Sequence, residues 1–166
     1  AAITGSPDVC VGSTTVLASS TTGGVWSTSD ATVADVSASG VVTGASTGSA
    51  TITYTVTDGN GCTNSTSASV TVNASPTATV TASGATTFCA GGSVDLTANA
   101  GTSYLWSNGA QTQTITVTTS GSYSVTVTNG SGCSTTSSAE AVTVNPLPTV
   151  ASITGSPDVC VGSTTV

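Results

Sequence analysis

Residues 51–58 read TITYTVTD, in which every second residue from Ile52 to Val56 is apolar. Successive side chains of a β-strand point to opposite faces of the sheet. Ile52, Tyr54 and Val56 therefore share one face, and the threonines that alternate with them share the other. This alternation predicts a strand with one buried and one solvated face, and it assigns Tyr54 to a hydrophobic core.

The same alternation returns at residues 122–128, SYSVTVT, and assigns Tyr123 to a second core. Each of these strands is followed by a Gly/Asn turn that leads to a cysteine, DGNGC ending at Cys62 and NGSGC ending at Cys133. Each is preceded by a further cysteine and a tryptophan, with Cys-to-Trp spacings of 26 − 10 = 16 and 106 − 89 = 17 residues. The chain is therefore predicted to fold as two homologous all-β domains.

The segments VNASP and VNPLP mark the expected domain ends, because proline ends a strand and stiffens a short connection. We expect one domain at residues 1–75 and a second at residues 76–147.

A long internal repeat indicates that the chain belongs to an array. The fourteen residues ITGSPDVCVGSTTV occur at 3–16 and again at 153–166, an offset of 153 − 3 = 150 residues. Repeats of solenoids are much shorter, roughly 20 to 50 residues, so each period is expected to hold whole domains. Residues 148–166 are therefore expected to start the next copy of the first domain, within a longer secreted polypeptide.

The charge balance excludes several classes of function. The chain has no Lys, Arg or His, and its net charge is −7. Nucleic acids and anionic membranes are bound through basic side chains, so we expect neither as a partner. Without His, the common nucleophilic triads cannot be assembled, and we expect no enzyme activity, no cofactor and no metal site. The acidic residues are Asp8, Asp30, Asp35, Asp58, Asp95, Glu140 and Asp158.

The cysteines are expected to form one disulfide per domain. Domains of about 70 residues bury a modest core and often carry a covalent staple in an oxidising, extracellular compartment. We expect Cys10 to pair with Cys62, and Cys89 with Cys133. Cys160 is the equivalent of Cys10 one period on, since 10 + 150 = 160, so its partner is expected outside this segment of chain.

Residues 25–56 contain the elements W-S, V-A-x-V, G-x-V-T-G and G-x-A-T-I in order, and they resemble the bacterial Ig-like domain of group 2. Residues 88–144, with CAGGSVDLTA, YLWSNG and SGSYSVTVTNGSGC, resemble the Ig-like or PKD-like modules of giant surface proteins of Bacteroidota. The resemblance implies tandem immunoglobulin-like β-sandwiches of antiparallel sheets in a cell-surface adhesin or filament. It supplies no catalytic residues.

In an immunoglobulin-like sandwich a strand C tryptophan is buried between the sheets, which implies core positions for Trp26 and Trp106. The cysteines depart from the antibody pattern, because they lie beside a turn and before an early strand. We therefore expect each bridge to fasten one end of its sandwich.

Three groups of polar residues have more than one interpretation. Asp58 and Asn60 fit either a calcium site or a plain Gly/Asn turn, and the turn is favoured because few carboxylates converge there. Rows of alternating threonines fit either a flat ligand surface for ice or glycan or, more simply, strand propensity on a solvated face. Possible N-glycosylation triplets begin at Asn64, Asn73 and Asn129.

The favoured function is a structural repeat unit of an extracellular filament or cell-surface stalk. The alternative is an adhesin module that binds a glycan or surface through its loops. Sheet edges without Lys and with few prolines suggest that edges or exposed apolar residues such as Val16 contact neighbouring copies of the protein. The expected partners are thus copies of itself and, in the alternative, a glycan.

Overall fold

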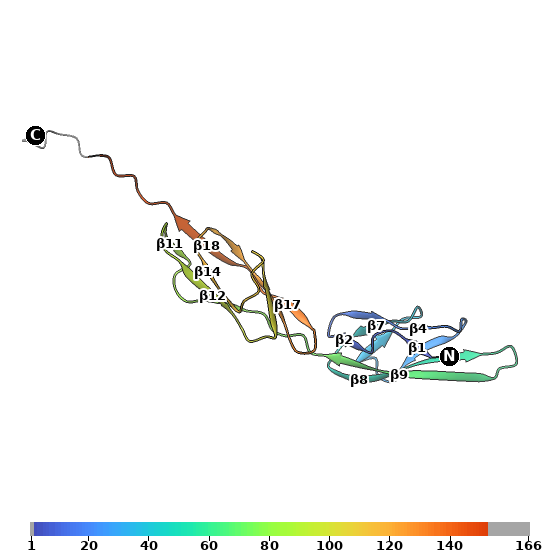
Figure 1. Cartoon of the computed structure of the whole chain (residues 1–166). Coiled ribbons are helices and arrows are strands. Elements are labelled where there is room, and N and C mark those ends of the chain that lie inside the picture. Colours follow the sequence, from blue (N-terminus) through green and yellow to red (C-terminus); the bar gives the residue numbers. More distant parts are fainter. Residues whose placement is uncertain (1, 153–166) are drawn as a thin grey trace, which may run out of the picture.

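The computed structural model describes residues 2–152 and shows two β-domains arranged end to end (Figure 1). Within those residues, eighteen strands are present, and no helix has the length and apolar character needed to cross a membrane. The predicted fold class, tandem all-β immunoglobulin-like sandwiches, is confirmed.

The first domain has a four-stranded sheet in the order β2-β9-β8-β5, a three-stranded sheet in the order β3-β7-β6, and the short pair β1-β4. Its strands are β1 (Ile3–Thr4), β2 (Asp8–Cys10), β3 (Thr14–Val16), β4 (Ala18–Ser19), β5 (Val25–Thr28), β6 (Ala34–Val36), β7 (Val41–Gly44), β8 (Gly48–Thr57) and β9 (Thr63–Asn73). Residues of the two larger sheets meet in one core, which contains Val9, Leu17, Ala34, Val42, Ala50, Ile52, Val70 and Val72.

The second domain divides its strands among three three-stranded sheets, β10-β12-β14, β13-β16-β17 and β11-β18-β15. These strands are β10 (Val80–Ala82), β11 (Thr87–Cys89), β12 (Val94–Ala98), β13 (Ser103–Trp106), β14 (Thr114–Val117), β15 (Gly121–Tyr123), β16 (Val125–Thr128), β17 (Ser134–Thr136) and β18 (Glu140–Asn145). The long β8-β9 hairpin of the first domain thus corresponds to two shorter pairings in the second, β15 with β18 and β16 with β17.

The alternation seen in the sequence sets the inward face of these strands. On β8, Ile52 and Tyr54 are buried, while Thr51 and Thr57 are exposed. On β15 and β16, Tyr123, Val125 and Val127 are all buried. The structure thus buries Tyr54 and Tyr123, as the alternation predicted.

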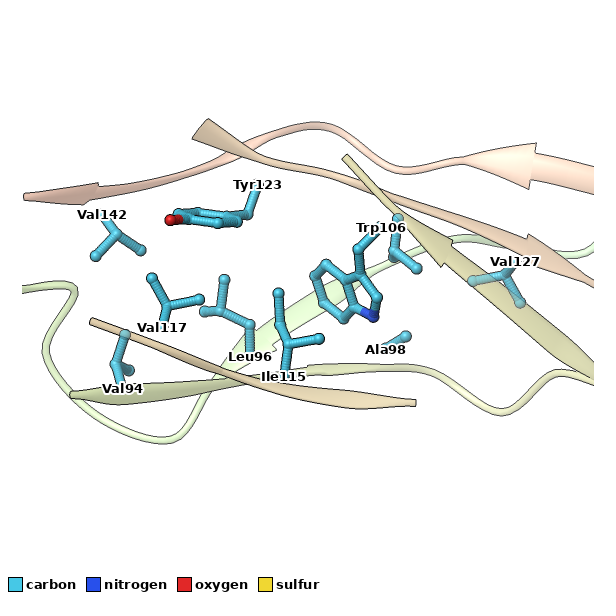
Figure 2. Close-up of a cluster of buried hydrophobic side chains, with 10 residues drawn as sticks. Val94, Leu96, Ala98, Trp106, Ile115, Val117, Tyr123, Val127 and Val142 are labelled. Atoms are coloured by element: carbon cyan, nitrogen blue, oxygen red, sulfur yellow. The ribbon is translucent and has the colours of Figure 1, made fainter. Parts of the chain in front are cut away.

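Trp106 lies at the centre of the second core and is only 2% exposed (Figure 2). Its indole Nε1 donates a hydrogen bond of 2.8 Å to the carbonyl oxygen of Thr112. Its polar group is satisfied and its ring is surrounded by aliphatic side chains, which include Leu96 and Ile115. Trp106 is thus the central core residue that its strand position predicted.

Trp26 occupies the matching position on β5 but is only partly buried, which corrects the expectation of a full core position. β5 is the edge of its sheet, since it pairs only with β8. One side of the Trp26 ring packs against Tyr54, with ring centroids 4.6 Å apart. The Trp26 ring also lines an open hollow with Val16 and the loop at residues 21–24. Trp106 likewise lies on an edge strand, β13, but there the segment that contains Ala110 and Thr112 covers its ring.

The Tyr54 hydroxyl ties β8 to the loop before β5. It donates to the carbonyl oxygen of Thr21 at 2.9 Å and accepts from the backbone N–H of Gly24 at 2.8 Å. Tyr54→Phe should lower the free energy of unfolding of the first domain by about 1–3 kcal/mol, because both backbone groups lose a partly buried partner. Urea denaturation followed by circular dichroism measures this loss. Thr57→Val, at an exposed position of the same strand, is the control and should change stability by less than about 0.5 kcal/mol.

Asp30 caps the turn before β6 and makes this turn sensitive to acid. Its carboxylate Oδ1 accepts from the hydroxyl of Thr32 at 2.6 Å and from the Thr32 backbone N–H at 2.9 Å, and these bonds lower the pKa of Asp30. A lowered folded-state pKa gives stability that is present above the unfolded value of 3.8 and is lost as pH falls through the folded value. Asp30→Asn should therefore flatten the decline in melting temperature below about pH 4. An unchanged acid profile in the Asp30 variant would contradict this role.

Candidate functional site

The joint between the two domains carries a disulfide bond. Cys10, the last residue of β2, is bonded to Cys133, which lies in the turn before β17, with the two Cα atoms 5.7 Å apart. Both β2 and β17 lie beside the point where the domains meet (Figure 1). Cys133 is buried, with 1% of its surface exposed. A covalent bond thus fastens one domain to the next.

This bond shows that the predicted pairings, Cys10 with Cys62 and Cys89 with Cys133, are wrong. β2 runs parallel to the end of β9, so that Cys10 is opposite Asn73, whereas Cys62 directly precedes the first residue of β9. A strand rises about 3.3 Å per residue, which places these two ends roughly 33 Å apart, far beyond the Cα separation of about 6 Å in a disulfide.

The second domain separates its own cysteines in the same way. Cys89 is opposite Asn145 at the end of β18, and Cys133 precedes β17 at the other end of the domain. The bridge therefore does not fasten one end of a single sandwich, as expected from the sequence. Within the described residues, Cys62 and Cys89 are free and exposed, and Cys160 lies outside that part of the chain.

Asn129 holds the turn that presents Cys133. Its side-chain Oδ1 accepts from the backbone N–H groups of Ser131 and Cys133, each at 3.0 Å. Its Nδ2 donates to the carbonyl oxygen of Ala74, in the linker, at 2.8 Å. A second contact at the joint runs from the Ser75 hydroxyl to the carbonyl oxygen of Val11, at 3.2 Å. One side chain thus orders the cysteine turn and also fixes it to the linker.

Asn129→Asp should weaken the joint while keeping the turn. The carboxylate can still accept the two turn N–H groups, but it places an acceptor against the Ala74 carbonyl in place of a donor. Loss of a hydrogen bond worth about 1 kcal/mol should open the joint more often and speed reduction of the Cys10–Cys133 disulfide by dithiothreitol about fivefold. Timed alkylation and mass spectrometry measure this rate.

The control for this substitution is Asp58→Asn, in the matching turn of the first domain. Asp58 Oδ1 accepts from the backbone N–H groups of Asn60 and Cys62, each at 2.9 Å, and has no contact with the linker. In the Asp58→Asn variant, the Cys10–Cys133 disulfide should therefore be reduced at the same rate as in the unmodified protein. Equal rates in both variants and the unmodified protein would show that the Asn129 contact does not hold the joint.

The same hydrogen bonds support the turn interpretation of Asp58 and Asn60. The Asp58 carboxylate is engaged by backbone amides of a Gly/Asn turn. Within residues 2–152, no group of three or more His, Cys, Asp or Glu side chains lies close enough together to hold a metal ion.

The three possible glycosylation residues differ in their surroundings. Asn64 is exposed on β9. Asn73 is partly buried where β9 pairs with Cys10. Asn129 uses its amide nitrogen at the joint. Asn64 is therefore the most accessible of the three, and modification of any of them stays a prediction.

The threonines of β14 lie on an outward face, where their hydroxyls bond to the neighbouring strand β12. The hydroxyl of Thr114 contacts that of Thr97 at 3.0 Å, and the hydroxyl of Thr116 donates to Asp95 at 2.6 Å. On the β8-β9 face, Ser49 contacts Ser69 at 2.9 Å. Such cross-strand bonds agree with the simpler interpretation, that these residues suit a solvated strand face.

A shallow hollow of about 390 Å³ lies beside the edge strand β5. Trp26 and Tyr54 line it together with exposed Val16 and the loop at residues 21–24. The sequence did not suggest this place, because both aromatic residues were assigned to the core. No signal in the sequence separates Trp26 from Trp106, since both lie on strands that the structure places at a sheet edge.

Paired sheets around two separate cores, with a tryptophan on the matching strands β5 and β13, define a chain of immunoglobulin-like β-sandwiches. Residues 11–67 of the first domain match the family of bacterial Ig-like domains of group 2. The resemblance seen at residues 25–56 is thereby confirmed. The resemblance of residues 88–144 to PKD-like modules, and the link to Bacteroidota, remain predictions.

Several solved structures are similar to this chain at low identity. Murine CEACAM1b is 14% identical with a TM-score of 0.39, over 86% of this chain and 100% of that chain. The extracellular domains 3–5 of Drosophila OTK are 15% identical with a TM-score of 0.38, over 89% and 62%. The S-layer protein rSbsC(31-844) is 20% identical with a TM-score of 0.33, over 87% and 25%.

The chain thus spans about a quarter of the S-layer chain that it matches. The search of curated proteins gave no match.

Proposed function

We propose that this chain is a non-catalytic structural repeat unit of a secreted or cell-surface filament or stalk. The observation that supports the proposal most strongly is the disulfide between Cys10 and Cys133, which fastens two successive domains instead of stapling one. A catalytic or ligand-binding domain needs no such bond to a neighbour. In a filament, by contrast, the joints between domains are the places that bend, so a covalent bond there stiffens the whole array.

The joint contacts fit this role. The hydrogen bonds of Asn129 and Ser75 act on the linker itself, so that the short connection between β9 and β10 is fixed at more than one point. Such a connection transmits tension from one domain to the next. We propose the domain boundaries 1–75, 76–147 and 148–166 for this array, with the last range as the start of the next period.

Imaging of the native material tests the proposal. Electron microscopy of the secreted or surface material, labelled with antibodies against this chain, should show thin filaments with an axial period of two domains. Dispersed single molecules, with antibody label and no filament, would overturn it.

The hollow beside β5 supports a second candidate, an adhesin module. The Trp26 ring is partly open to solvent and could stack on a sugar ring, and the loop residues beside it offer hydroxyl and backbone groups. Binding on a glycan array that is abolished by Trp26→Ala, and kept by Leu105→Ala at a distant exposed residue, would support this function. No binding by the folded chain would remove it.

A further inference from the structure

The free thiols of Cys62 and Cys89 lie at the two outer ends of the domain pair. The turn that joins β8 to β9 and contains Cys62 is at the outer end of the first domain, and β11, which ends at Cys89, is at the outer end of the second (Figure 1). Both cysteines are exposed. Each therefore faces the position that a neighbouring domain of an array would occupy.

Cys89 has the same backbone environment as the bonded Cys10. Cys10 is opposite Asn73 in a parallel pair, and the next residue, Val11, donates its N–H to the Asn73 carbonyl oxygen at 3.0 Å. Cys89 is opposite Asn145 in a parallel pair, and Ala90 donates to the Asn145 carbonyl oxygen at 2.8 Å. The second domain thus presents Cys89 at its exit as the first domain presents Cys10.

Cys62 has the same environment as the bonded Cys133. Asp58 accepts the backbone N–H of Cys62 at 2.9 Å, as Asn129 accepts that of Cys133 at 3.0 Å. In both turns the residue before the cysteine is a glycine with positive φ, Gly61 at 83° and Gly132 at 78°. The entry end of the first domain thus presents Cys62 as the entry end of the second presents Cys133.

The two domains also match in the linkers that follow them and in the sequence separation of their cysteine pairs. Residues 70–77 read VTVNASPT and residues 142–149 read VTVNPLPT, so the exits of both domains have the same length and the same proline. The observed bond has a sequence separation of 123 residues. From Cys89 to the Cys62 of the next period the separation is 62 + 150 − 89 = 123 residues, the same value.

We propose that Cys89 forms a disulfide with the Cys62 of the next period, so that every joint of the array is closed by a bond of the Cys10–Cys133 type. The inference rests on the proposed function, in which a further period follows. The first domain would then be bonded to its predecessor through Cys62 and to its successor through Cys10. Every disulfide of the array would then join two domains, and none would lie within a single domain.

The chemistry requires an external disulfide as the oxidant. The two thiols lose two protons and two electrons as the S–S bond forms, and the oxidant, a small-molecule or oxidoreductase disulfide, takes them up and leaves as two thiols. Oxidised glutathione is a suitable laboratory source. Both cysteines are exposed, so oxidised glutathione can reach either thiol and form the mixed disulfide that starts the exchange.

A chain of two periods tests the proposal. In it, residues 1–152 are followed by a second copy of residues 3–152, and the protein is oxidised with glutathione at low concentration. The eight cysteines should form three disulfides and leave two thiols, at Cys62 of the first period and Cys89 of the second. A peptidase that cleaves before aspartate puts Cys62 and Cys89 into one peptide, 58–94, so the new bond should join two copies of this peptide within a monomer.

Matched cysteine variants identify which Cys89 forms the new bond. Cys89→Ser in the first period should abolish the link between the 58–94 peptides and keep Cys10–Cys133, while Cys89→Ser in the second period should leave the link unchanged. Four unreacted thiols, or a link found only in covalent dimers on a non-reducing gel, would overturn the proposal. Filaments whose Cys62 and Cys89 are thiols would contradict this inference alone, whereas absence of filaments would contradict the proposed function.

Discussion

Reduction of the Cys10–Cys133 disulfide should free the joint to bend while both domains stay folded. Each domain has its own core, and these cores share no residue. The bond fixes how the two domains are placed relative to each other. Because the folded neighbour holds the partner cysteine beside the linker, the bond also closes a loop of about 60 residues in the unfolded state of either domain. After reduction, the joint retains the Asn129 and Ser75 hydrogen bonds, worth on the order of 1 kcal/mol each, which are too weak to hold one orientation.

Small-angle X-ray scattering measures this effect as a broader distribution of intramolecular distances. Thermal circular dichroism should show a lower melting temperature for the reduced protein, because loss of the loop closure lowers the stability of each domain by about 4 kcal/mol. The Cys62→Ser and Cys89→Ser double variant, which keeps the bond, is the control and should scatter like the unmodified protein. Disulfides within each domain would each close a loop of about 50 residues and stabilise it by about 4 kcal/mol. This loss is similar to the one expected for the Cys10–Cys133 bond, so the scattering experiment separates the two pairings. A distance distribution that stays the same on reduction would contradict the joint.

Trp106→Ala should destabilise the second domain by about 3–5 kcal/mol, because it removes the largest side chain of that core and leaves a cavity. This is a large fraction of the stability of a domain of this size. Calorimetry should show the transition of the second domain at a much lower temperature and that of the first domain little changed.

Trp26→Ala is the matched control, because Trp26 has the equivalent strand position but is partly exposed. Its loss should cost the first domain less than half as much. Equal losses in the two domains would contradict the difference in burial that separates the two tryptophans.

The strands could be predicted from the sequence because alternation is a local signal. Tyr54, Tyr123 and their apolar neighbours face inward as the period of two requires. The repeated Cys, Trp and turn also located two related domains. Trp26 shows the limit of this approach. Both tryptophans lie on edge strands, and their burial differs because a neighbouring segment covers the Trp106 ring while a hollow lies beside Trp26, which no residue near Trp26 encodes.

The disulfide could not be predicted from the two-domain plan alone. Pairing each early cysteine with the turn cysteine of its own domain assumes that both lie at the same end of the sandwich. The parallel pairing of β2 with β9 places Cys10 at the exit of the domain, beside the linker, and the turn with Cys62 at the opposite end. That pairing is a long-range feature, which the spacing of cysteines does not specify.

A peptide map of the unreduced chain tests the joint most directly. Cleavage before aspartate separates the peptides 8–29, 58–94 and 95–157, which hold Cys10, the pair Cys62 and Cys89, and Cys133. A bond between Cys10 and Cys133 should join peptide 8–29 to peptide 95–157, with 58–94 absent from that species. A species in which 58–94 is bonded to both of the others would show disulfides within each domain and would contradict the account.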